Sequence, residues 1–341
     1  MDYLAFTIRR LFYSIFVFIG LSILIFLIAR VLPGDPARLA LGPRAPKEVV
    51  EKLREQLHLN DPLPIQYYHW FTGVLHGDFG KSLHSWRPVI KDIKEYLPAT
   101  LELAFFSFCI MSIGGILAGV LAAALKDRWA DNTIRLFSYT GVAIPEFVWG
   151  ILLVLIFSHL LGIFPITERL SFGVSPPPLK TGFFTIDALL SGDFKTFFNA
   201  LKHIILPAIS LAMLPLAQAA RLTRITMIDN MRKDFMEAAR AYGIPSRVIW
   251  SRLLLKPSLI PAISLLPLSF ASLVTRAFLI ELIFRWPGLA RFGMEAIFHN
   301  DVNAVVAVVL VMGILFVTAN LVVDLIIGFL DPRIRVRALE Q

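Results

Sequence analysis

Residues 229–258 read DNMRKDFMEAARAYGIPSRVIWSRLLLKPS and form a polar stretch between two strongly apolar parts of the chain. From Arg221 to Lys256 the chain holds eight Lys or Arg residues against three Asp or Glu residues. Short loops rich in Lys and Arg are typical of the cytoplasmic side of membrane proteins. The stretch therefore predicts a cytoplasmic loop between two membrane-spanning helices.

The composition places the whole chain in the membrane class. Of its 341 residues, 57% are hydrophobic and 17% are charged, and the mean hydropathy is +0.70. Soluble proteins have about 45–50% apolar and about 25% charged residues. The net charge of +8 comes mostly from basic residues between apolar runs, which the positive-inside rule explains without nucleic acid as a partner. The single cysteine, Cys109, cannot form an intrachain disulfide, and one thiol does not make a metal site.

A helix that spans a membrane needs about 20 apolar residues. Six stretches meet this requirement: Leu11–Leu32, Thr100–Leu125, Phe137–Leu161, His203–Ala220, Ser258–Phe284 and Val305–Leu330. The first is too long for a signal peptide, and no small-x-small cleavage site follows it. Pro207 and Pro215 make the fourth the weakest of the six.

Basic residues fix the expected orientation. They lie before the first stretch, after the second, between the fourth and fifth, and after the sixth: Arg9 and Arg10; Lys126, Arg128 and Arg135; the 221–256 region; Arg333, Arg335 and Arg337. With six spans, all four groups fall on the same side. We therefore expect an all-α integral membrane protein with six transmembrane helices and both termini in the cytoplasm.

Two long segments fall on the outer side. Residues 33–99 open with PGDP and contain PKEVVEKLREQLHLN, where Val49, Val50, Leu53 and Leu57 share one helical face. This pattern predicts a small folded extracytoplasmic cap. Residues 164–200, with SPPPLK and TGFFTIDALLSGDFKTFF, predict a second outer lobe. The expected division is 1–32 for the N-terminus and first span, 33–99 for the cap, 100–330 for the transmembrane core and 331–341 for a cytoplasmic tail.

The sequence offers no catalytic site of its own. Gly80-Lys81-Ser82 resembles the end of a phosphate-binding loop, but Leu75 stands where that motif requires its first glycine. An ordinary glycine turn is the preferred interpretation, so any nucleotide would be bound by another chain. The HExxH and GxSxG motifs are absent, and no pair of carboxylates lies at helical spacing within a span. We therefore expect no catalytic residue, no cofactor and no metal ligand in this chain.

The polar stretch is predicted to form two short helices separated by a break. Phe235, Ala238, Ala239 and Tyr242 fall at i, i+3, i+4 and i+7 and so form one apolar stripe. Gly243 supplies the backbone freedom for a sharp stop, and a proline two residues later can begin the next helix. Such a helix either enters a groove on a cytoplasmic partner or rests on lipid headgroups. The residues alone leave both possibilities open.

Glu237-Ala238-Ala239 with Gly243 four positions on resembles the EAA loop of permease subunits in binding-protein-dependent ABC importers. The fragments RRLFYSIFVFIGLSILIFLI, PGDP, LPATLELA, IPEFVWGILLVLIFS, ILPAISLAMLPLAQAARLTR, IELIFRWPGLARF and DPRIR resemble the dipeptide, oligopeptide and nickel class in the same order. One departure is visible. The wider pattern Ile-x-Leu-Pro is replaced by Leu253-Leu254-Leu255-Lys256, with Pro257 one position later.

The resemblance implies a type I ABC importer permease that forms half of a pathway for short peptides. It implies three kinds of protein partner: a homologous second permease, two ATPase subunits that bind ATP and magnesium, and an extracytoplasmic substrate-binding protein. Within a coupling loop at 226–256, Phe235, Glu237, Ala238, Ala239, Tyr242 and Gly243 would contact the ATPase. The alternatives are oligosaccharides or nickel chelates as substrate. A standalone secondary transporter would need internal repeats, which the sequence does not show.

Charge inside a span is costly and often functional, and four such residues are singled out as candidates: Glu146, Arg276, Glu281 and Asp324. For Arg276 two roles are open. It either faces the transport pathway, where it would attract a peptide carboxylate, or pairs with an acid such as Glu281. The position of Glu281 within IELIF favours a structural role for that residue.

Overall fold

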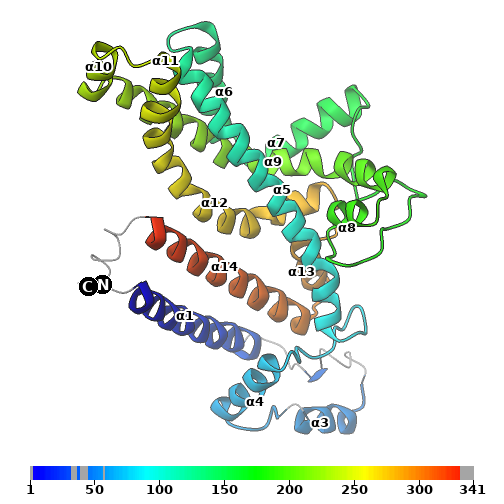
Figure 1. The fold of residues 1–341 in the computed structure, drawn as a ribbon. Helices are drawn as coiled ribbons and strands as arrows, with labels where there is room; N and C mark the ends of the chain where they lie inside the picture. The colour runs from blue at the N-terminus through cyan, green and yellow to red at the C-terminus, as the bar shows by residue number, and fades with distance from the viewer. Residues whose placement is uncertain (1–2, 32–36, 39–44, 57, 331–341) are drawn as a thin grey trace. The chain divides into compact units, whose positions relative to one another are not determined.

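The computed structural model describes residues 3–31, 37–38, 45–56 and 58–330. These residues are almost entirely helical (Figure 1), and their one extended pairing is the isolated bridge between Lys81 and Pro88. The chain divides into two compact units, Met1–Thr100 with Pro287–Gln341 and Leu101–Trp286. Residues from 287 onward, which belong to the proposed core 100–330, group with the N-terminal part.

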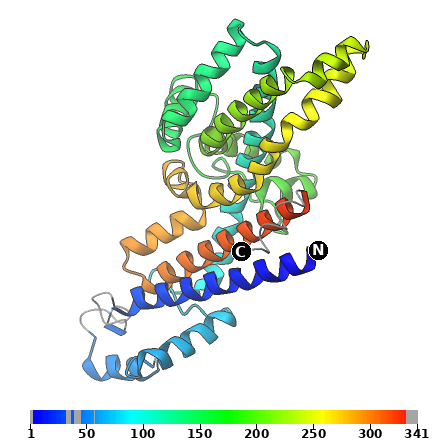
Figure 2. The same cartoon turned by 90° about the vertical axis from the view of Figure 1, so that its left-hand side faces the viewer.

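The first unit is built on two long apolar helices, α1 (Tyr3–Val31) and α14 (Val302–Leu330), which lie side by side (Figures 1 and 2). Gly313 lets the two helices approach closely, because a Cβ added there would meet the side chain of Leu21 at 2.1 Å. The unit also contains α3 (Lys47–Gln56), α4 (Leu63–Leu75), the start of α5 (Val89–Ala124) and α13 (Leu289–Phe298).

The second unit is organised around α9 (Phe194–Met231), the most deeply buried of its long helices. Packed on α9 are α6 (Trp129–Ala143), α7 (Glu146–Leu153), α8 (Phe184–Leu190) and α12 (Lys256–Ile283). A π-helical turn, η1 (Val154–Leu160), continues α7. Between α9 and α12 lie α10 (Asp234–Ala241), α11 (Ser246–Val248) and the π-helical η2 (Ile249–Leu255).

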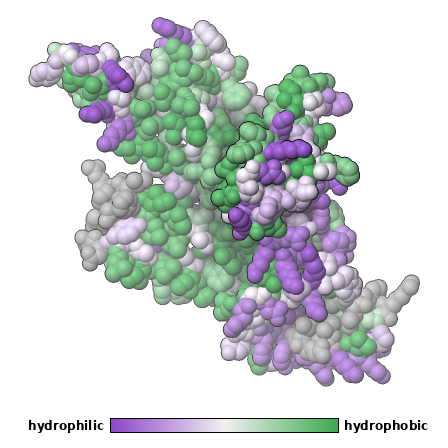
Figure 3. All heavy atoms as spheres, turned by 45° about the vertical axis from the view of Figure 1, so that its right-hand side comes forward, coloured by the Kyte–Doolittle hydropathy of each residue, from purple (hydrophilic) through white to green (hydrophobic). Residues whose placement is uncertain are grey.

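Among the described residues, five helices are long and apolar enough to cross a membrane, and a bent pair makes six. The five are α1, α5, α9, α14 and the helix that runs from Ser246 to Ile283. The predicted count of six spans agrees with this result. Large apolar side chains are exposed along these helices, and broad areas of the face in Figure 3 are hydrophobic. Lipid would solvate such surface.

The third predicted span, Phe137–Leu161, is not one straight helix. It consists of α6 followed by α7 and η1, bent by 113°. The cause is Pro145, which has no backbone N–H and disfavours the helical conformation in the residue before it. Ile144 accordingly has extended backbone angles, φ −93° and ψ 125°. Proline does not have this effect in α9. This helix continues without a break through Pro207 and Pro215, although these prolines made it the weakest of the six candidate spans.

Two helices begin earlier in the structure than the sequence predicted. The second span begins at Val89 rather than Thr100, so eleven residues of the predicted cap belong to α5. The first helix begins at Tyr3 instead of Leu11. Both extensions contain charged residues, such as Arg9 and Asp92, which a count of apolar residues places outside the span.

The cap and the Gly80 turn follow the predictions in part. A helix forms at α3, with Val50 buried but Val49 exposed, while the side chains of Leu53 and Leu57 and the PGDP segment lie outside what the structure describes. Gly80 has a left-handed φ of +79°. The Ser82 hydroxyl donates to Asp301 at 2.6 Å. These residues therefore form a turn and not the start of a nucleotide-binding helix, as predicted.

Close packing of α5 on α9 gives the first testable prediction. A Cβ at Gly119 would meet the Ala220 carbonyl oxygen and the Thr223 Cβ, both at 2.6 Å. We expect Gly119→Ala to lower the free energy of unfolding by about 1–3 kcal/mol, because the helices must move apart. Thermal unfolding in detergent measures the change.

The matched control is Gly20→Ala in α1, where an added Cβ meets nothing within 4 Å. The control variant should unfold at the wild-type temperature. Equal effects of the two substitutions would contradict the assigned packing.

Candidate functional site

The polar stretch forms a short helix whose ends are set by local chemistry. Asp234 and Glu237 lie in the first turn of α10 and Arg240 in its last turn, which favours the helix dipole at both ends. Gly243 then has φ +69°. Its N–H donates to the Arg240 carbonyl at 3.0 Å, and that of Ile244 donates to the Ala239 carbonyl at 3.1 Å. These two bonds are the Schellman arrangement that ends a helix, and they require the left-handed residue.

The inner face of α10 anchors it to the rest of the unit. Met236 and Ala239 are buried in a cluster with residues from the ends of α5 and α9 and from η2: Ala123, Met227, Ile228, Ile249 and Leu254. Burying a side chain such as Met236 stabilises by about 1.5–3 kcal/mol. The helix is therefore held on its neighbours and does not hang as a free loop.

The outer face of α10 carries two aromatic rings toward solvent. Tyr242 is 86% exposed and Phe235 is 42% exposed, and Glu237 and Ala238 are also exposed. Figure 1 shows α10 beyond the ends of α9 and α12. The predicted stripe is therefore divided, since Ala239 faces the protein while the other three residues of the stripe face outward. Periodicity did not distinguish the two faces because Ala239 lies only about 60° around the helix from the buried Met236.

A hydrogen-bond clamp joins the two ends of the loop, and the sequence did not predict it. Asn230, at the end of α9, donates its amide to the Ser258 hydroxyl at 2.8 Å. The Thr226 hydroxyl donates to the Ser258 carbonyl at 2.8 Å. Asn230 and Ser258 are both buried. The helices on either side of α10 are thereby fixed to each other at the point where the chain leaves them.

Charged residues inside the predicted spans form ion pairs between helices. Arg276 on α12 donates from Nε to Oε1 of Glu146 at 2.8 Å, and its second nitrogen binds Oε2. Glu281, the example of an acid that could pair with Arg276, is completely buried one turn and a half further along α12. Glu146 was a candidate in its own right but was not named as the partner, because it lies 130 residues away, at the start of α7 just after the bend. Asp324 on α14 pairs with Arg10 on α1 at 3.1 Å.

Comparisons with known proteins agree with the resemblance to importer permeases. Residues 115–336 match the family described as "Binding-protein-dependent transport system inner membrane component". Residues 3–104 match the corresponding N-terminal family. The chain belongs to this permease family.

Curated relatives cover nearly the whole permease. A probable D,D-dipeptide transport system permease protein of Escherichia coli K12 is 39% identical over 326 residues, 96% of each chain. A di/tripeptide transport system permease protein of Pseudomonas aeruginosa is 37% identical, over 97% of this chain and 99% of its own. A dipeptide transport system permease protein of Alkalihalophilus pseudofirmus is 35% identical over the same shares. The permease is a multi-pass protein of the cell membrane.

A buried ion pair orders the lobe formed by residues 164–200 of the permease. Arg169 binds Glu102 of α5 and donates to the Gly182 carbonyl at 2.8 Å. Its guanidinium also lies 3.5 Å from the centre of the Phe184 ring. Glu102 accepts from the hydroxyl and the backbone N–H of Thr185 at 2.6 and 2.8 Å. No sequence signal joins residues 67 positions apart, so this contact was not predicted.

Asp187 closes the loop before α8 in the same lobe. It accepts the backbone N–H groups of Lys180, Thr181 and Gly182 at 2.8–3.1 Å and the Thr181 hydroxyl at 2.8 Å. Burial alone would raise the pKa of this carboxyl, but the four hydrogen bonds outweigh it and hold the pKa below its usual value. The ionised form is therefore part of the folded lobe.

One group of potential metal ligands lies in the first unit: His58, Asp61 and His69. The His58 and His69 rings are stacked, 4.2 Å apart and parallel within 7°. A metal ion lies in the plane of each imidazole that binds it, and two rings stacked in this way cannot both meet that condition. The His58–Asp61 hydrogen bond of 3.0 Å and the ring stacking account for the cluster without a metal.

The Arg276–Glu146 pair can be tested by a double-mutant cycle. We expect Arg276→Gln or Glu146→Gln alone to destabilise by about 2 kcal/mol, because each leaves one partly buried charge unpaired between α7 and α12. The double variant should recover part of the loss, and thermal unfolding measures all three. Strictly additive losses would contradict a direct interaction.

Asp187 predicts a pH dependence. Because its pKa is lower in the folded lobe than in the unfolded chain, its stabilisation is present above the unfolded value of about 3.9 and is lost as the pH falls toward the folded value. The unfolding temperature of the wild type should fall below about pH 4. Asp187→Asn, unable to ionise, should show a smaller fall over the same pH range, measured by the same thermal scan.

Proposed function

We propose that this chain forms half of the translocation pathway for short peptides in an ATP-driven importer. The relatives named above are permeases of dipeptide and di/tripeptide transport systems, and they align with this chain over almost their full length. Five long apolar helices and one bent pair are few for a complete pathway, which supports assembly with a homologous second permease. Both termini and the α9–α12 loop would face the cytoplasm, as the basic residues indicate.

In this proposal α10 is the contact with an ATPase subunit. The observation that carries it is the combination of a well-anchored inner face with an outer face on which Tyr242 and Phe235 are exposed. Exposed aromatic side chains on a rigid helix are suited to a pocket on a partner, where they bury area at little entropic cost. Glu237 would make polar contacts at the edge of that pocket. ATP and magnesium would be bound by the two ATPase subunits.

The clamp supplies the means of transmission. A force applied to α10 reaches α9 and α12 through Met236 and through the hydrogen bonds to Ser258. A loose loop would absorb the same displacement. An extracytoplasmic binding protein would deliver the peptide to the opposite side, where the cap and the lobe around Asp187 are the available docking surfaces.

Gly243→Leu tests the coupling role. The substitution places a branched side chain at φ +69°, which costs about 1–2 kcal/mol and shifts the exit from α10. We expect association with the ATPase subunits to weaken roughly five- to thirtyfold, with a matching loss of ATP-dependent dipeptide uptake in proteoliposomes. Copurification and uptake are the two measurements.

The control is Gly162→Leu, which has φ +63° and, like Gly243, open space around an added Cβ. It carries similar backbone strain but lies at the end of η1, away from α10. Wild-type uptake by Gly243→Leu, or equal loss of ATPase subunits from both variants, would refute the proposal.

A further inference from the structure

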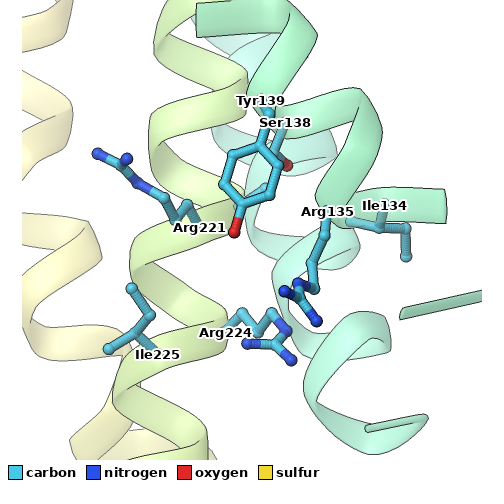
Figure 4. A pocket seen from close by; sticks show the side chains of 8 residues that line it. Ile134, Arg135, Ser138, Tyr139, Arg221, Arg224 and Ile225 are labelled. Atoms are coloured by element: carbon cyan, nitrogen blue, oxygen red, sulfur yellow. The ribbon is translucent and has the colours of Figure 1, made fainter. Parts of the chain in front are cut away.

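A basic pocket lies between α6 and α9, separate from α10. Its lining includes Arg135 and Tyr139 on α6 and Arg221 and Arg224 on α9. Figure 4 shows the guanidinium groups of Arg135 and Arg224 directed into the same space, with the Tyr139 hydroxyl pointing toward them and Arg221 on the other side of the ring. Two positive charges thus converge on one small opening, and a third lies beyond the Tyr139 ring.

Only one of these charges is neutralised within the described part of the chain. Arg224 makes a two-point contact with Asp131, with Nε to Oδ1 at 2.6 Å and the second nitrogen to Oδ2 at 2.7 Å. Asp131 is fully buried and also accepts the Asp127 backbone N–H at 3.0 Å. Among the described residues, no carboxylate lies within salt-bridge distance of Arg135 or Arg221. Three arginines and one aspartate leave the pocket with a net charge of +2.

The chemistry of the pocket fits a phosphate group. Guanidinium groups bind phosphate oxygens through paired, charge-assisted hydrogen bonds, and a tyrosine hydroxyl can donate a further one. Arg224 is held in position by Asp131 and so is ordered before a ligand arrives. A pocket with an excess of two positive charges favours a dianion or two adjacent phosphates.

The surroundings indicate that the phosphate belongs to a lipid. Trp129, at the start of α6, is 80% exposed, as is typical of a tryptophan at the membrane interface. Arg135 lies six residues further along α6, about 9 Å deeper, which is within reach of the headgroup layer for a long side chain. Leu136, Phe137 and Ile225 are exposed apolar residues on the same helices. They would contact acyl chains beside a bound headgroup.

We propose that this pocket binds the headgroup phosphate of an anionic phospholipid, such as phosphatidylglycerol or cardiolipin, at the membrane surface. Arg135 and Arg224 hold the phosphate oxygens, Tyr139 donates its hydroxyl, and Arg221 neutralises a second negative charge. Basic pockets between transmembrane helices are suited to such lipids. The site does not depend on the substrate or on the ATPase, so it can be tested on this chain by itself.

The test compares lipids on the full chain purified in detergent. Phosphatidylglycerol and phosphatidylcholine of equal chain length are added separately, and bound lipid is counted by native mass spectrometry. We expect the wild type to retain phosphatidylglycerol in preference, and Arg135→Gln to lose roughly tenfold in apparent affinity for it. Arg135 is the residue to change because it has no ion pair whose loss would disturb folding.

Arg128→Gln is the matched control, since Arg128 is an exposed arginine just before α6 that does not line the pocket. It should retain the wild-type preference. Thermal scans without lipid should give both variants the wild-type unfolding temperature, which shows that the loss is one of binding.

Three outcomes would overturn the proposal. The first is an unchanged preference for phosphatidylglycerol in Arg135→Gln. The second is displacement of the lipid by millimolar inorganic phosphate, which would assign the pocket to a free anion. In the third, Arg135→Gln leaves lipid binding to the purified chain intact but, in a separate copurification, releases an ATPase subunit, which would assign the pocket to a protein partner.

Discussion

The hydrogen bonds at Ser258 are the constraint on which the arrangement of the polar loop depends. Ser258 is completely buried and is bound through both its hydroxyl and its carbonyl, by Asn230 and Thr226 of α9. Within a low-dielectric interior such bonds are strong, and a group left without its partner would be expensive to bury. The ends of α9 and α12 therefore keep a fixed separation. The short helix between them is supported at both ends as well as along its inner face.

A second regularity concerns charge in the apolar parts of the permease. Arg276 is matched by Glu146, Arg10 by Asp324 and Arg224 by Asp131. Each pair joins two different helices, so the pairs fix neighbouring helices relative to each other in addition to lowering the electrostatic cost of burial. The lobe at residues 164–200 follows the same principle, since Glu102 binds a cation and also accepts hydrogen bonds from the hydroxyl and N–H of Thr185. Arg135 and Arg221 differ from these residues, because no carboxylate among the described residues lies within salt-bridge distance of either one.

The elements that could be predicted are those with a strong local signal. Apolar length predicted six spans, and Gly243 was recognised as a helix end because its chemistry acts over a few residues. Local signals did not separate the two faces of α10, where Ala239 packs inward. They also did not identify Glu146 as the partner of Arg276, because pairing between distant residues depends on how the helices pack. The bend in the third span was missed since an apolar count does not register the effect of Pro145 on Ile144.

That bend has a mechanical consequence. Its angle of 113° lies at Pro145, which lacks the amide hydrogen a continuous helix would use, and at the extended backbone of Ile144. While the bend keeps this angle, α6 and α7 move together as one rigid, bent unit. A slide of α6 along its own axis becomes a nearly sideways sweep of α7, and the bond between Glu146 and Arg276 would carry that sweep to α12.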